Sequence, residues 1–135
     1  MPLVRIHVFK GRSVDELQTL LDVAHDVVVE AFGVPRPDRY QILEEHEKSH
    51  LQVLDTGLGM DRSERFVLFE IITRVRSRTM KLVLYETLAR SLRMQCGIDP
   101  SDVMVSIVEN SDEDWSFGMG RAQFMTGELT ASKTD

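Results

Sequence analysis

The sequence has almost no cysteine, no long apolar run and no excess of positive charge. Its one cysteine, Cys96, cannot form an intramolecular disulfide. No apolar run approaches the roughly 20 residues that a membrane-spanning helix needs, and the first residues alternate charged and apolar side chains, unlike a signal peptide. Lysine and arginine total 16 and aspartate and glutamate 22, for a net charge of −6, which removes the electrostatic case for a nucleic-acid or anionic-membrane partner. We therefore expect a cytoplasmic protein.

The chain length limits the architecture. A chain of 135 residues can bury roughly two-thirds of its unfolded surface in one core. It is too short for two independent cores. We therefore expect one domain over residues 1–135.

The first third of the chain has the pattern of a strand, a helix and a second strand. Residues 2–9 alternate apolar and polar side chains, which is typical of a half-buried strand. Ser13 and Glu16 form a capping box, which satisfies backbone amides at a helix start. Apolar residues then keep helical spacing as far as Gly33, a residue type that commonly ends helices. A strand-like segment, 39–45, completes a βαβ unit, in which the two strands are usually parallel.

The second half of the chain repeats this unit at a shift of 64 positions, the interval between Ser13 and Ser77. Six residues are identical at that shift, and the caps and the apolar spacing agree with it, which is stronger than any single match. The identical pairs are Arg12 and Arg76, Ser13 and Ser77, Leu20 and Leu84, Gly33 and Gly97, Asp38 and Asp102, and Glu45 and Glu109. This register predicts helices over 14–32 and 78–95.

These patterns predict an α+β fold of two fused βαβ units. The units, about 2–45 and 65–109, form one four-stranded sheet with both helices on one face; a linker, 46–64, joins them and a C-terminal arm, 110–135, follows. The other face of such a sheet needs a cover, so we expect a closed homo-oligomer. The apolar residues expected on that face are Val4, Ile6, Leu68 and Ile107.

Pro2 could carry chemistry through its nitrogen. A proline at the first position of a strand can be purely structural, because it lacks the amide proton that a sheet would use. A small residue after Met1 also favours removal of the initiator methionine, which would leave a secondary amine at the end of the sheet. That amine can act as a base when neutral, or as an acid or an iminium-forming nucleophile when suitably charged.

Three charged residues could act with that amine. Arg74 and Arg76 follow the third predicted strand at spacing i, i+2, so an extended backbone places both side chains on one face, where they could hold a carboxylate. The alternative role for this pair is that of solvated charges before a helix. Asp38 precedes a strand, where aspartate is common as a turn residue. Near the Pro2 nitrogen, its carboxylate would favour the charged amine, whereas the arginines would favour the neutral amine.

Aromatic side chains follow the last predicted strand. Trp115, Phe117 and Phe124, with Leu129 beyond them, can anchor the C-terminal arm. The same residues can form an apolar wall of an active site, and the two roles are compatible.

The histidines do not indicate a metal site. They show no ligand spacing with Cys96 or with paired carboxylates along the sequence. The four are His7, His25, His46 and His50.

Several longer motifs lie between residues 2 and 129. They include Ala31-Phe32-Gly33-Val34-Pro35, Asp38-Arg39-Tyr40-Gln41-Ile42, Asp55-Thr56-Gly57-Leu58-Gly59, Val105-Ser106-Ile107-Val108-Glu109-Asn110-Ser111 and Asp114-Trp115-Ser116-Phe117-Gly118. On these motifs the chain resembles the malonate semialdehyde decarboxylases of the tautomerase superfamily. A match of this length is hard to attribute to a shared fold alone.

The resemblance implies a role for each candidate residue. Pro2 would be the catalytic proline, Asp38 the catalytic aspartate, and Arg74 and Arg76 the two arginines that bind the substrate. The residues implied as the hydrophobic wall are Trp115, Phe117, Phe124 and Leu129. The resemblance also implies the tautomerase fold, a homotrimer, a small anionic 3-oxo acid as substrate, and no metal or organic cofactor.

The implied reaction is the decarboxylation of malonate semialdehyde (3-oxopropanoate), or of a close 3-oxo acid, to acetaldehyde and carbon dioxide. Arg74 and Arg76 would turn the carboxylate out of the carbonyl plane, so that the breaking bond overlaps the carbonyl π system. Protonated Pro2, kept charged with help from Asp38, would hydrogen-bond the aldehyde oxygen or form an iminium with the aldehyde.

Three other functions fit the same residues. A tautomerase of phenylpyruvate or similar enol or keto acids would use neutral Pro2 to move a proton, and Asp38 argues mildly against it. A hydratase or dehalogenase of 3-substituted acrylates would use Asp38 to activate water while Pro2 supplies a proton. A trimeric interaction protein would keep Pro2 blocked by Met1.

Overall fold

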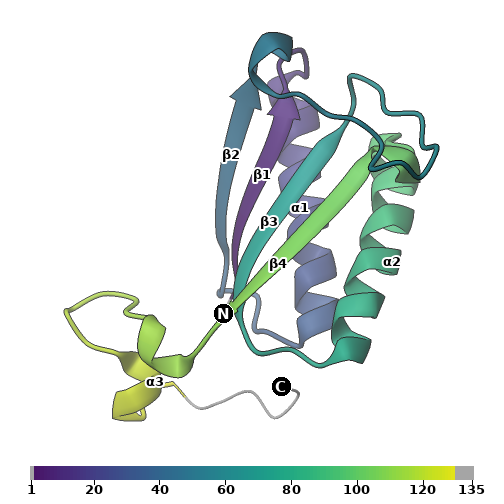
Figure 1. The fold of residues 1–135 in the computed structure, drawn as a ribbon. Helices are drawn as coiled ribbons and strands as arrows, with labels where there is room; N and C mark the ends of the chain where they lie inside the picture. Colours follow the sequence, from purple (N-terminus) through teal and green to yellow (C-terminus); the bar gives the residue numbers. More distant parts are fainter. Residues whose placement is uncertain (1, 130–135) are drawn as a thin grey trace.

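The elements follow one another in the order that the repeat predicts (Figure 1). The computed structural model describes residues 2–129, so Met1 and the end of the expected C-terminal arm lie outside the described residues. The long elements are β1 (Leu3–Phe9), α1 (Val14–Phe32), β2 (Tyr40–His46), β3 (Val67–Arg74), α2 (Arg78–Cys96) and β4 (Val103–Asn110). The short elements are η1 (Lys48–His50), η2 (Pro100–Asp102), η3 (Asp112–Asp114) and α3 (Gln123–Thr126).

The ends of the two long helices confirm the 64-residue repeat. The Ser13 hydroxyl accepts a hydrogen bond from the Glu16 amide at 3.1 Å, and the Ser77 hydroxyl caps α2 in the same way. Gly33 ends α1 with φ 66° and ψ 30°, and Gly97 ends α2 with φ 65° and ψ 28°. The predicted helices are therefore confirmed, with α2 one residue longer than expected.

The sheet has the strand order β2-β1-β3-β4. The strands of each βαβ unit are parallel, whereas the two central strands, β1 and β3, are antiparallel. As a result β1 and β2 begin at the edge of the sheet where β3 and β4 end. We call this edge the site edge.

Both long helices cover one face of the sheet (Figure 1). Val4 and Ile6 point toward these helices and are almost fully buried, and Ile107 packs against the same core. The prediction that Val4, Ile6 and Ile107 lie on the opposite face is therefore wrong. Of the four residues, only Leu68 lies on that face, because it alternates with the core residues of β3. The alternating patterns were assigned to the wrong face because both faces carry apolar residues.

The face without helices, here called the open face, mixes charged and apolar side chains. Its residues include Arg5, His7, Ile42, Glu44, Glu70, Ile72, Met104 and Val108. Within residues 2–129, no helix combines the length and apolarity needed to cross a membrane.

Candidate active site

The start of β1 lies between the start of β2 and the end of β3. Leu3 pairs with Tyr40 in β2 and with Ile72 in β3. Pro2, one residue before Leu3, therefore lies at the site edge. Its side chain is buried.

The three charged residues predicted for the site also come to this edge. Asp38 lies two residues before β2, Arg74 is the last residue of β3, and Arg76 lies two residues beyond it. Their exposed fractions are 8% for Asp38, 8% for Arg74 and 3% for Arg76. Three ionisable groups are thus withdrawn from solvent within a few residues of the sheet end that carries Pro2.

Asp38 sits in a loop that is tied to α1. The His25 ring hydrogen-bonds the Arg36 carbonyl through Nε2 at 2.9 Å, and Arg39 forms an ion pair with Asp22 at 2.7 Å. Burial raises the pKa of Asp38 above its ordinary value, and the positive charge of Arg76 acts in the opposite direction. The protonation state of Asp38 is therefore sensitive to nearby cations.

Asp102, the repeat equivalent of Asp38, has a different role. Its carboxylate accepts hydrogen bonds from the Ser63 amide at 2.6 Å and from the Ser63 hydroxyl at 2.5 Å. These bonds attach the linker to the turn before β4. Asp102 is therefore a structural turn residue.

Arg74 is held by the C-terminal arm. Its Nε donates to the Asp112 carboxylate at 2.5 Å, and its guanidinium carbon lies 4.3 Å from the centre of the Phe124 ring. The first contact is a charge-assisted hydrogen bond and the second a cation–π contact. Together they orient the guanidinium from two sides.

Arg76 is held by the body of the fold. Its backbone amide donates to Glu109 at 2.7 Å, and its Nε donates to the Thr73 hydroxyl at 3.0 Å. Its guanidinium carbon lies 4.9 Å from the centre of the Phe32 ring at the end of α1. Val75, between the two arginines, is 64% exposed, which is the alternation that the i, i+2 spacing predicts.

Four aromatic rings connect the arm to the start of β2. The Trp115 and Phe117 rings stack at 5.5 Å, and the Phe124 ring meets Phe117 edge-on at 5.6 Å. Phe117 also stacks on Tyr40 at 5.9 Å. Leu129, expected in the same wall, lies three residues beyond α3 and is half-buried, and its amide donates to the carbonyl of Gln123, the first residue of α3.

A pocket of about 660 Å³ opens beside this arm. Its lining includes Arg74, Asn110, Asp112 and Met125, so β3, β4 and the arm all contribute to it. Of the four predicted catalytic residues, Arg74 is the one that lines this pocket. The volume lies in the range typical of small-molecule sites.

Several residues that hold the site were not predicted from the sequence. Asp112 and Glu109 position the two arginines, and Tyr40 receives the arm. The acidic run 112–114 could have indicated Asp112, and the identity of Glu45 and Glu109 in the repeat could have indicated Glu109. Their roles depend on contacts between distant segments, which the sequence pattern does not show.

Comparison with known proteins identifies the family. Residues 38–118 match a family model described as tautomerase enzyme, and residues 2–61 match a second model with the same description. The chain is 50% identical to the probable tautomerase YrdN of Bacillus subtilis (strain 168) over 129 residues, covering 96% of this chain and 100% of that protein. It is 33% identical to the probable tautomerase YusQ of the same organism, covering 93% and 99%. The chain belongs to the tautomerase superfamily.

Two solved structures are similar over nearly the whole chain. A structure of malonate semialdehyde decarboxylase, described in terms of decarboxylase and hydratase activities, has a TM-score of 0.93 and 48% identity and covers 95% of this chain and 99% of that one. A second malonate semialdehyde decarboxylase, inhibited by 3-bromopropiolate, has a TM-score of 0.92 and 37% identity and covers 96% and 99%. These structures confirm the resemblance and the tautomerase fold that the sequence motifs predicted.

Proposed function

We propose that this protein decarboxylates malonate semialdehyde, or a close 3-oxo acid, to acetaldehyde and carbon dioxide without a metal cofactor. The observation that supports the proposal is that Pro2, Asp38, Arg74 and Arg76 all lie at the site edge, or within two residues of a strand end there, and that all four are buried. Similarity at 48% and 37% identity to two malonate semialdehyde decarboxylases supports it.

The two arginines bind the carboxylate in this proposal. A guanidinium offers a planar pair of donors that fits a carboxylate, and a buried guanidinium binds it more strongly than an exposed one. Asp112 and Phe124 orient Arg74, and Thr73 and Phe32 orient Arg76. The pair turns the carboxylate out of the carbonyl plane, so that the breaking C–C bond overlaps the carbonyl π system.

Pro2 supplies the acceptor for the electrons that this bond leaves behind. Once Met1 is removed, its protonated amine hydrogen-bonds the aldehyde oxygen or condenses with the aldehyde to form an iminium and water. The Asp38 carboxylate stabilises the charged amine. Carbon dioxide leaves, the resulting enol or enamine takes a proton at carbon, and acetaldehyde is released directly or after hydrolysis of the iminium.

The aromatic rings of the arm exclude water in the proposed mechanism. Trp115, Phe117 and Phe124 pack together beside Arg74 and supply an apolar wall with Leu129. Low local polarity strengthens the interactions between the arginines and the carboxylate.

We also propose that the functional unit is a homotrimer. The open face carries partly exposed apolar residues, including Ile42, Ile72 and Met104, that one chain leaves uncovered. Trimeric relatives with the same fold support this assembly.

The decisive experiment measures carbon dioxide release from malonate semialdehyde. Two proteins are compared: one with Met1 removed and one that keeps a residue ahead of Pro2, each verified by intact mass. The extra residue converts the Pro2 amine into an amide, so release should fall at least about 100-fold, the lower range for loss of an acid–base group. Thermal unfolding of both proteins is the control for folding.

Two further assays separate the alternative activities. The probable tautomerase relatives make phenylpyruvate tautomerisation the first comparison, and the hydratase activity named for a similar structure makes hydration of a 3-substituted acrylate the second. The proposal expects the highest kcat/KM with malonate semialdehyde. It is wrong if the blocked protein decarboxylates as fast as the processed one, or if phenylpyruvate is the better substrate.

A further inference from the structure

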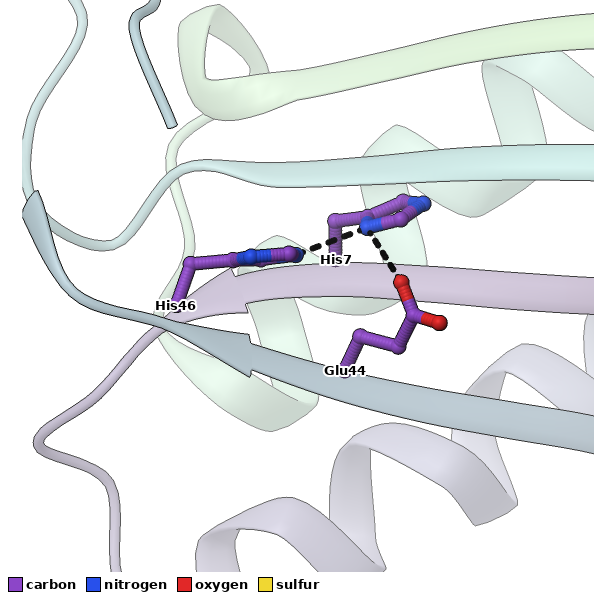
Figure 2. A group of neighbouring side chains, drawn as sticks. All are labelled: His7, Glu44 and His46. Carbon is purple, nitrogen blue, oxygen red and sulfur yellow. Dashed lines mark hydrogen bonds and ion pairs between the residues drawn. The ribbon is translucent and has the colours of Figure 1, made fainter. Parts of the chain in front are cut away.

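Two histidines and a glutamate converge on the open face, at the end of β1 and β2 that is remote from the site edge. Figure 2 shows the side chains of His7 from β1 and of Glu44 and His46 from β2 pointing toward one another. His7 lies five residues along β1 from Pro2, which corresponds to about 16 Å of extended chain. The cluster is therefore separate from the candidate active site.

The facing atoms of this cluster are all potential metal ligands. His7 Nδ1 lies 2.9 Å from His46 Nε2 and 3.2 Å from a carboxylate oxygen of Glu44. One ligand atom from each residue lies within 4.8 Å of the other two. Lone pairs on two imidazole nitrogens and a carboxylate repel one another at such distances unless a proton or a cation lies between them.

Glu70 on β3 fixes the orientation of His7 from the other side. Its carboxylate lies 2.5 Å from Nε2 of His7, the ring nitrogen that faces away from His46. A carboxylate in this place favours the tautomer with the proton on Nε2, which leaves Nδ1 with a lone pair directed at the cluster. Metal-binding histidines commonly have such a carboxylate partner on their second nitrogen.

We propose that His7, Glu44 and His46 bind a zinc ion, with Glu70 as the residue that orients His7. Two imidazole nitrogens and one carboxylate oxygen form a ligand set that suits zinc, and the fourth position would hold water. Zinc bonds of about 2.0–2.2 Å in a tetrahedral arrangement separate ligand atoms by about 3.3–3.5 Å. The observed 2.9 and 3.2 Å are slightly shorter than that spacing, and the third distance, between His46 and Glu44, is within 4.8 Å, so side-chain rotation would adjust all three.

The ligand types agree with this assignment. In the single chain, the His7 side chain is 13% exposed and the Glu44 side chain 39% exposed; the proposed homotrimer would cover the open face, so the ion would then lie inside the assembly. Magnesium and calcium prefer sites made of oxygen ligands, so the two imidazoles argue against them. The bound ion would tie β1 to β2 and, through Glu70, to β3.

The strand register explains why the sequence spacing did not indicate this site. His7 pairs with Glu44 across the two parallel strands, and Phe9 pairs with His46. Alternation then places His7, Glu44 and His46 on the same face. The expectation of no metal site came from spacing along the chain, whereas this cluster forms between strands.

The test is zinc titration of tag-free, metal-stripped full-length protein, followed by calorimetry. The expected stoichiometry is one zinc ion per chain. Glu44→Gln and His46→Gln should each weaken binding more than Glu70→Gln, which should weaken it about 10–100-fold as the loss of an orienting carboxylate does. His50→Ala is the matched control, because His50 is an exposed histidine four residues beyond His46, and its affinity should equal that of the unaltered protein.

Two additional measurements distinguish a loss of zinc binding from a folding defect. Circular dichroism of the metal-free variants checks the fold, and Glu44→Gln keeps the size of the side chain. Cobalt added in place of zinc should give the visible absorption of a tetrahedral site in the unaltered protein and lose it in His46→Gln. The proposal is wrong if the unaltered protein binds no zinc, if His46→Gln binds it equally well, or if His50→Ala removes the binding. None of these outcomes depends on decarboxylase activity.

Discussion

Asp112 accepts a hydrogen bond from Nε of Arg74 at 2.5 Å, and this contact joins the C-terminal arm to the end of β3. The Arg74 guanidinium also lies over the Phe124 ring, so the arm holds this arginine through both a charge and a ring. In the proposed mechanism, the arm therefore positions one of the two arginines that bind the substrate carboxylate.

The first prediction concerns this positioning. Asp112→Asn keeps the shape of the side chain but removes its charge, so Arg74 should be less well oriented and kcat/KM for malonate semialdehyde should fall about tenfold, the loss expected for a charge-assisted hydrogen bond. Steady-state kinetics with Asp61→Asn as the control tests this, because Asp61 is an exposed aspartate of the linker that does not line the pocket beside the arm. Equal effects of the two substitutions would show that Asp112 has no specific role.

The second prediction concerns the buried carboxyl group of Asp38. Because burial raises its pKa in the folded protein, the folded state holds its proton more tightly than the unfolded state. Ionisation of Asp38 therefore reduces stability as the pH rises from the ordinary value of 3.8 through the raised value. Asp38→Asn should increase Tm relative to the unaltered protein at about pH 8 more than at about pH 4, while decarboxylation decreases.

Asp102→Asn is the matched control for this experiment. Asp102 is the repeat equivalent of Asp38, and its carboxylate accepts two hydrogen bonds from Ser63. Its substitution should lower the free energy of unfolding by about 1–3 kcal/mol, because the two Ser63 donors lose a charged acceptor that is itself buried. A Tm increase for Asp38→Asn that is the same at both pH values would contradict the proposed cause.

The third prediction concerns the attachment of the arm. Phe117→Ala removes the stack on Tyr40 and the contacts with Trp115 and Phe124, each pair being worth about 0.5–1.5 kcal/mol. The arm should then be cleaved faster in limited proteolysis, and KM for the substrate should rise. Tyr40→Phe keeps the ring and should leave both measurements unchanged; faster cleavage in this variant would mean that the stack does not hold the arm.

The fourth prediction concerns assembly. Met104 is 41% exposed on the open face, so Met104→Lys places a charge where the proposed homotrimer would bury apolar surface. Light scattering should detect a trimer for the unaltered protein and a smaller species for this variant. Leu54→Lys, at an 86% exposed linker position, should remain trimeric. A stable monomer of the unaltered protein at micromolar concentration would contradict the assembly.

The sequence by itself determined the elements and their repeat. Ser13 and Gly33 mark the ends of α1, and Ser77 and Gly97 mark the ends of α2, as predicted. Such signals can be read from the sequence because a cap is satisfied within three or four residues. Pro2, Asp38, Arg74 and Arg76 were also selected as candidates from the sequence. Pro2 was selected for its nitrogen and the arginines for their i, i+2 spacing, and the resemblance then implied a role for each of the four.

The tertiary structure decided which side chains meet. It placed Val4 and Ile6 under the helices and brought His7 to Glu44 and His46 on the opposite face. It also joined Arg74 to Asp112, 38 positions away. These contacts depend on strand register and on the path of the arm, and a one-residue change of register would turn every strand side chain to the other face. Local sequence patterns contain no such information, because the free energy that selects a register comes from packing between distant segments.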